Sequence, residues 1–150
     1  QRIKIDLSTD DVITPSAIRY SYRLMFEDRS IELMTYTPET LLAEKIQTIL
    51  ARGITTARMR DYYDVYEIVV GNKVSIDKTV LAEAFTATCM KRKTTFGSEQ
   101  IEKIVNEISA DEELLNLWEL YKNDNFYVGD IKWTVVCEVV CGYIRDNISK

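Results

Sequence analysis

Two aspartates, Asp61 and Asp64, lie one helical turn apart in the segment RMRDYYDVYEIVV, residues 58 to 70. The rest of this segment is rich in Met, Tyr, Val and Ile, a composition typical of a buried helix face. Burying an ionised carboxylate costs several kcal/mol unless a cation compensates its charge. We therefore expect basic side chains from another part of the chain to pair with these two aspartates.

Lys45 is the first candidate for that cation. It lies in the segment LLAEKIQTILAR with Leu41 and Ile49 one turn to either side, which places it at the edge of an apolar helical stripe. Arg52 follows seven residues later, within about 20° of Lys45 around the helix. A lysine facing an aspartate pair on a neighbouring helix has two interpretations. It is an ion pair that fixes the two helices, or a cation and carboxylate beside a phosphate-bearing ligand.

The composition restricts the chemistry that is available. The chain has no histidine, which removes Ser/His and Cys/His nucleophiles and leaves Asp, Glu, Lys and Tyr for acid–base work. Cys89, Cys137 and Cys141 show no CxxC spacing, so we expect no structural zinc and a reduced, cytoplasmic protein. No apolar run reaches the roughly 18 residues of a membrane span, so we expect no membrane partner.

The charge is unevenly distributed along the sequence. A net charge of -5 argues against bulk nucleic-acid binding. Between residues 99 and 130 there are nine acids against two bases, whereas residues 45–60 and 84–98 contain no acid. The basic residues form either a local basic surface or ordinary solvated helix faces. The basic residues of these two acid-free stretches are Lys45, Arg52, Arg58, Arg60, Lys91, Arg92 and Lys93.

The elements that must position these residues follow from hydrophobic periodicity. Alternation predicts a strand at 3–7 and a β-hairpin made of 17–26 and 31–36 around the polar loop 27–30. Thr37 and Pro38 then begin a helix at 38–52, which Gly53 ends. The fold class is therefore α+β, a short N-terminal antiparallel β piece followed by a helical bundle. Further helices are predicted at 59–70, 76–91, 98–108, 111–122 and 131–147.

Residues 36–66, YTPETLLAEKIQTILARGITTARMRDYYDVY, together with FTATCMKRKT at 85–94, resemble the AbiEii/AbiGii nucleotidyltransferase-like family. Its members are toxins of type IV toxin–antitoxin and phage-abortive systems. The shared features are AEK on a helix after a strand, an Arg in a following RG, the RDxYD sequence and a T-x-x-x-R-x-T run. The resemblance implies a nucleotidyltransferase core with a helical C-terminal portion that uses NTP and Mg²⁺ to modify a target such as the acceptor end of tRNA.

The resemblance also implies roles for particular residues. Lys45 matches the lysine that contacts the nucleotide phosphates, with Arg52 beside it as a second nucleotide-binding residue. Asp61 and Asp64 match the catalytic acids of the RDxYD motif. Asp6 stands where a third, metal-binding carboxylate of the core is expected. An antitoxin protein is the expected macromolecular partner, and Arg58, Arg60, Lys91, Arg92 and Lys93 are the candidates for RNA contacts.

One departure from the family pattern bears on activity. Two-metal phosphoryl transfer needs clustered carboxylates, and the family supplies them with an Asp-x-Asp pair after a Gly-Ser/Thr turn. Neither is found before Lys45. We therefore expect residues 1–36 to be the β piece of a truncated core, residues 37–150 to be a helical C-terminal domain, and this chain to be inactive with no bound NTP or Mg²⁺. The alternative is a non-catalytic helical module that binds a protein partner such as an antitoxin.

Overall fold

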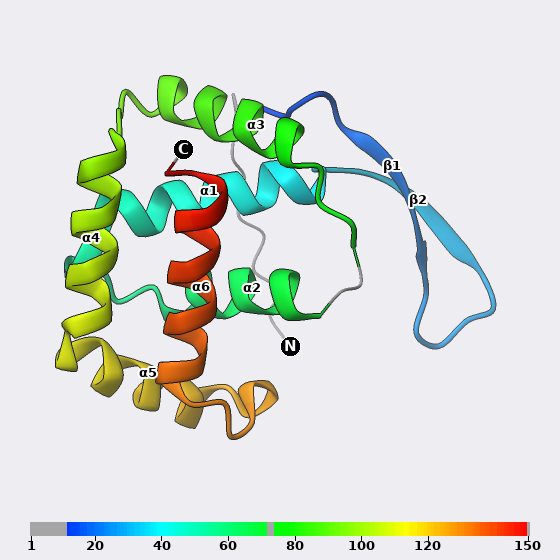
Figure 1. Cartoon of the computed structure of the whole chain (residues 1–150). Helices are drawn as coiled ribbons and strands as arrows, with labels where there is room; N and C mark the ends of the chain where they lie inside the picture. Colours follow the sequence, from blue (N-terminus) through cyan, green and yellow to red (C-terminus); the bar gives the residue numbers. More distant parts are fainter. Residues whose placement is uncertain (1–11, 72–73, 150) are drawn as a thin grey trace.

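The computed structural model describes residues 12–71 and 74–149. Strands β1 (Ile18–Arg23) and β2 (Ser30–Thr35) form an antiparallel hairpin that projects from one side of the helical body (Figure 1). Most of its apolar side chains are exposed, and Phe26 at its tip is 93% exposed. The predicted hairpin is confirmed, but β1 ends at Arg23 rather than at residue 26, so the connecting loop is 24–29 instead of 27–30. The strand predicted at 3–7, and Asp6 within it, lie outside the described residues.

Six helices follow the hairpin in the described part of the chain, at the positions that periodicity predicts. Their ends differ from the predicted ends by at most two residues, which is the usual uncertainty of helix boundaries. Two short 3₁₀ turns, η1 (Gly53–Thr55) and η2 (Phe126–Val128), precede α2 and α6. The α+β class with a helical bundle is confirmed. The helices are α1 (Pro38–Arg52), α2 (Met59–Val70), α3 (Lys78–Lys91), α4 (Ser98–Ala110), α5 (Glu112–Asp124) and α6 (Trp133–Asn147).

Helix α1 begins and ends where its capping residues require. The Thr37 hydroxyl accepts a hydrogen bond from the Thr40 backbone N–H at 3.2 Å, and Pro38 occupies the first turn, where its missing N–H costs nothing. Gly53 ends the helix with φ of 50°, a conformation that favours glycine, and its N–H bonds the Ile49 carbonyl. These caps fix the length of the helix that carries Lys45.

The apolar core holds α2 against α1 and α6. Helix α1 also packs against α3, and Figure 1 shows α1 and α2 running in opposite directions, joined through η1. Tyr62 of α2 meets Trp133 of α6 edge to face at 5.1 Å, and Trp133 contacts Trp118 of α5 at 5.9 Å. The Trp118 indole N–H donates to the Ile131 carbonyl at 2.9 Å. This aromatic cluster fixes the rotation of α2, and therefore the direction in which its aspartates point.

None of the helices in residues 12–71 and 74–149 combines the length and the apolarity needed to cross a lipid bilayer.

Tyr62 carries the one tyrosine hydroxyl in the described residues that is buried without a hydrogen-bond partner. An unsatisfied buried hydroxyl costs about 1 to 3 kcal/mol. We therefore expect Tyr62→Phe to raise the free energy of unfolding by about 1 kcal/mol in denaturant titrations. Tyr20→Phe is the control, because Tyr20 is 54% exposed on the hairpin. A loss of stability in Tyr62→Phe would show that the hydroxyl has a partner.

Tyr62 also links stability to pH. Burial raises the pKa of its phenol far above the ordinary value of 10.0, since the phenolate is desolvated in the core. A raised folded-state pKa means that the phenol's contribution is fully present below about pH 10 and is lost as the pH rises further. The wild-type chain should therefore lose stability above pH 10 more steeply than Tyr62→Phe, measured by denaturant titration at successive alkaline pH values.

Candidate functional site

Charged side chains from α1 and α2 meet in an open depression of about 470 Å³. It lies where the polar edge of α1 faces the acidic side of α2, and we call it the carboxylate depression. Its charged residues include both aspartates of the RDxYD motif and the lysine of AEK. The lining residues are Leu41, Lys45, Arg58, Arg60, Asp61, Asp64, Glu67 and Ile68.

The Lys45 ammonium lies between the two aspartates. Its Nζ is 3.3 Å from Asp61 Oδ1 and 2.5 Å from Asp64 Oδ2. The Lys45 side chain is 14% exposed, that of Asp61 6% and that of Asp64 27%. The prediction that Lys45 faces the aspartate pair is confirmed. Water is largely excluded from the contact with Asp61, so the attraction there is screened less than in a surface ion pair.

Two arginines complete the pairing of the aspartates. Arg58 Nε donates to Asp61 Oδ2 at 2.9 Å, and Arg60 Nε lies 3.7 Å from Asp64 Oδ2. Sequence reasoning had assigned both arginines to RNA contact only. The signal that could have found these pairs was their spacing of three and four residues from the aspartates along one helix. Each aspartate therefore has two cationic partners, Lys45 from α1 and one arginine from its own helix or helix cap.

The first turn of α2 positions Asp61. Arg58 is the N-cap residue, and its N–H is held by the Thr56 hydroxyl at 3.0 Å. Asp61 then falls in the first turn of α2, where the free N–H groups of the helix end favour a negative charge. Met59 and Tyr62 are buried on the adjoining face of the same turn. Asp61 is thus fixed by its backbone, by its neighbours and by two cations.

The aspartate pair does not fit a magnesium ion. Mg²⁺ requires several unengaged oxygen ligands in an octahedral arrangement. Both oxygens of Asp61 already accept from cations, and one oxygen of Asp64 lies near two. Across the residues that the structure describes, no group of three or more Cys, Asp or Glu side chains is gathered closely enough to hold a metal. The metal-site prediction for Asp6 is outside the described residues.

Arg52 lies in a second depression, of about 390 Å³, rather than beside the aspartates. We call it the arginine depression. Arg58 lines both depressions and so connects them. Of the remaining predicted RNA contacts, Arg92 lines the arginine depression, whereas Lys91 and Lys93 are exposed and line neither. The arginine depression is lined by Gln47, Thr48, Ala51, Arg52, Arg58, Arg92 and Thr94.

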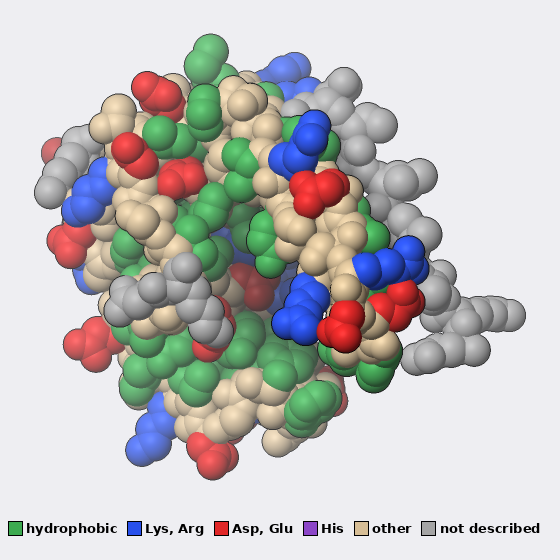
Figure 2. Space-filling view, turned by 90° about the vertical axis from the view of Figure 1, so that its right-hand side faces the viewer, with side chains coloured by type: hydrophobic (Ala, Val, Ile, Leu, Met, Phe, Trp, Pro, Cys, Tyr) green, Lys and Arg blue, Asp and Glu red, His purple; other side chains and the backbone are tan. Residues whose placement is uncertain are grey.

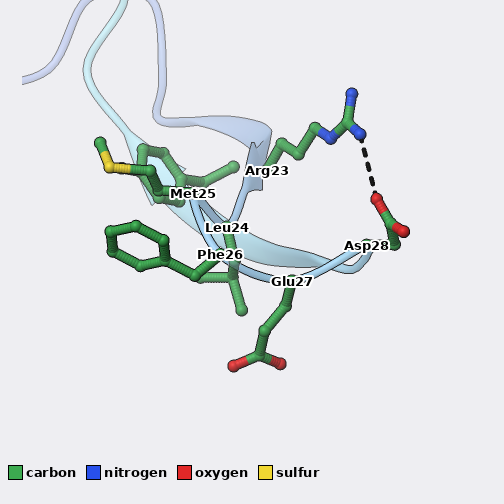
Figure 3. A pocket seen from close by; sticks show the side chains of 7 residues that line it. Arg23, Leu24, Met25, Phe26, Glu27 and Asp28 are labelled. Carbon is green, nitrogen blue, oxygen red and sulfur yellow. Dashed lines mark hydrogen bonds and ion pairs between the residues drawn. The ribbon is translucent and has the colours of Figure 1, made fainter.

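A third hollow lies at the tip of the hairpin (Figure 3) and holds none of the predicted site residues. It is lined by the consecutive residues 22–28, and an exposed ion pair of 3.2 Å joins Arg23 to Asp28 across the tip. The face drawn in Figure 2 shows acidic and basic side chains mixed with hydrophobic ones, with no large area of a single charge. We therefore place the candidate site at the two helical depressions.

The family model described as nucleotidyl transferase AbiEii toxin, type IV TA system, matches residues 1–135. The chain therefore belongs to the AbiEii family of nucleotidyltransferase-like toxins. Comparisons with curated proteins and with solved structures gave no match.

The pairing geometry predicts the energetic role of Lys45. In Lys45→Met, the two aspartates lose their shared cation while Arg58 and Arg60 remain. We expect a loss of about 2 kcal/mol in the free energy of unfolding, less than the ~3 to 5 kcal/mol for a fully uncompensated buried charge. Lys103→Met is the control: its side chain is 77% exposed beside Glu107, and it should change stability by less than about 0.5 kcal/mol. Equal losses of stability in Lys45→Met and Lys103→Met would show that Lys45 does not stabilise the fold by pairing with the two aspartates.

Proposed function

We propose that this chain supplies the lysine and aspartate part of a nucleotidyltransferase toxin that transfers a nucleotide from an NTP to an RNA, such as tRNA, or to a protein target. The single observation that carries the proposal is the cluster of Lys45, Asp61 and Asp64 on the wall of an open depression. Family membership supports the same assignment.

The proposed role of Lys45 is electrostatic. Phosphoryl transfer depends mainly on positioning and on stabilising the charge that spreads over the phosphate oxygens. The two aspartates hold the lysine ammonium at the depression wall, so it needs little reorganisation when a phosphate approaches. Asp64 is the more exposed of the two acids, and its contact with Lys45 is the one that a phosphate oxygen would compete for. Asp61 acts as the fixed anchor of the cluster.

Magnesium must be held elsewhere in this proposal, because Asp61 and Asp64 are occupied by cations. Residues 1–150 contain no Asp-x-Asp pair. We therefore propose that transfer requires metal-binding carboxylates in addition to this chain, and that Mg²⁺ and NTP serve the complete enzyme. An antitoxin is the proposed protein partner and the cytoplasm the proposed location, both by analogy with the family.

A specific observation favours the second candidate function, a non-catalytic module that binds a protein. In the carboxylate depression three cations, Lys45, Arg58 and Arg60, face three acids, Asp61, Asp64 and Glu67. Such a balanced group needs no ligand to compensate it. In that case the cluster only fixes α1 to α2, and the exposed apolar side chains of the hairpin offer a contact surface for a partner such as an antitoxin.

The double variant Lys45→Met with Asp61→Leu separates the two functions. It replaces the buried pair by apolar side chains of similar size, so we expect melting near that of the wild type. In a protein that combines this chain with a metal-binding carboxylate pair, we expect nucleotide transfer to fall by several orders of magnitude, because the variant lacks the ammonium that the proposal places at the transferring phosphate. Lys103→Met again serves as the control. Recovery of transfer in the folded double variant would assign both residues to a structural role.

The 150-residue chain should fold without transferring nucleotide. Its helices have their own caps and a shared core, whereas the Asp-x-Asp pair is missing from its sequence. The measurement is incubation with labelled NTPs, Mg²⁺ and total tRNA, followed by gel separation of RNA and protein. Label on either would show that the carboxylates of this chain suffice and would refute this account of the metal.

A further inference from the structure

The two neighbouring depressions differ in charge balance. The carboxylate depression is balanced, with three basic and three acidic side chains. The arginine depression has three arginines and no acid, and its other polar lining residues are the neutral Gln47, Thr48 and Thr94. Arg58 is paired with Asp61, but Arg52 and Arg92 have no acidic partner among the described residues, so the hollow keeps a net positive charge. A net positive charge in a hollow favours the binding of an anion.

Arg92 is held in place by neutral acceptors. Its Nη1 donates to Gln47 Oε1 at 2.5 Å, to Thr48 Oγ1 at 2.8 Å and to the Glu44 carbonyl at 3.4 Å. Gln47 is buried and donates in turn to Thr94 Oγ1 at 3.1 Å. These contacts fix the guanidinium without neutralising it. Within the described part of the chain, Arg92 Nε and Nη2 have no partner and are available as donors.

Arg52 and Arg58 bring further donors to the same hollow. Arg52 forms no ion pair and no side-chain hydrogen bond with any described residue. Arg58 uses Nε for Asp61, and its two terminal nitrogens have no partner among the described residues. Guanidinium groups present paired N–H donors in a geometry that matches phosphate oxygens. The three arginines come from the end of α1, the start of α2 and the end of α3, so only the folded chain unites them.

We propose that the arginine depression binds a phosphate group, with Arg52, Arg58 and Arg92 as its donors. Because Arg58 also pairs with Asp61, the bound phosphate lies next to the lysine–aspartate cluster. Two sources share this chemistry: the triphosphate tail of an NTP and a backbone phosphate of an RNA acceptor. Phosphate binding itself does not require transfer activity, and only the choice between these sources rests on the proposed function.

Calorimetric titration of the 150-residue chain with pyrophosphate at low ionic strength tests the site. Arg52→Ala is the main variant, because the Arg52 side chain has no hydrogen bond or ion pair with a described residue to lose on substitution. We expect it to weaken pyrophosphate binding by roughly tenfold, the effect of one charge-assisted contact. Lys91→Ala is the matched control, since it removes one exposed positive charge nearby and should change binding less than about twofold. Melting curves verify that each variant is folded.

Arg92→Ala provides a second test from a different element, and we expect a loss at least as large as in Arg52→Ala. Absence of pyrophosphate binding to the wild-type chain would overturn the proposal. Equal losses in Arg52→Ala and Lys91→Ala would overturn it too, because they would show attraction by overall charge only.

Competition distinguishes the two sources. If the site takes a triphosphate tail, ATP displaces pyrophosphate, whereas an oligoribonucleotide without terminal phosphates does not. If it takes a backbone phosphate, the oligoribonucleotide competes. The double variant Lys45→Met with Asp61→Leu should still bind pyrophosphate, since Arg52 and Arg92 are unchanged. Transfer in that variant together with intact pyrophosphate binding would refute the proposed catalytic role of Lys45 and leave the phosphate site standing. Unchanged pyrophosphate binding in the folded Arg52→Ala variant would refute the phosphate site and leave the catalytic role of Lys45 standing.

Discussion

The contact of one ammonium with two carboxylates governs how the helical body is arranged. Lys45 on α1 reaches Asp61 and Asp64 on α2, and Asp61 is almost completely removed from water. A carboxylate in that position is stable only while its cations stay in place. The register between α1 and α2 is therefore set by charge as well as by packing. If either helix were displaced by one turn, Asp61 would lose its contact with Lys45 and keep Arg58 as its cationic partner.

The apolar core makes this arrangement rigid. Tyr62 and Val65, on the same helix as the aspartates, are fully buried, and the ring contacts of Trp133 with Tyr62 and with Trp118 connect α2 to α6 and α5. Dense packing of this kind leaves few alternative rotations for α2. The polar cluster and the aromatic cluster thus act on adjoining faces of one helix. Together they hold the aspartates within reach of Lys45.

Positive charge is divided between two adjacent hollows according to what surrounds it. Around Lys45 the cations are matched by acids, whereas in the adjacent hollow Arg92 is held by an amide and a hydroxyl. Arg58 belongs to both groups. The charged residues of this chain thus form two parts, a largely buried cluster that stabilises the helices and a neighbouring hollow with net positive charge. A phosphate-bearing ligand is complementary to the second part.

The sequence alone determined the elements and the central pair. Periodicity and the caps at Thr37, Pro38 and Gly53 predict α1, and the apolar setting of Asp61 requires a cation, because local patterns and the cost of a buried charge are both readable from the chain. Only the tertiary structure decided that Arg52 turns away from Lys45 and joins Arg92, forty residues later in the sequence. Helical spacing places two residues on one face, but the neighbouring helices determine which hollow each side chain enters.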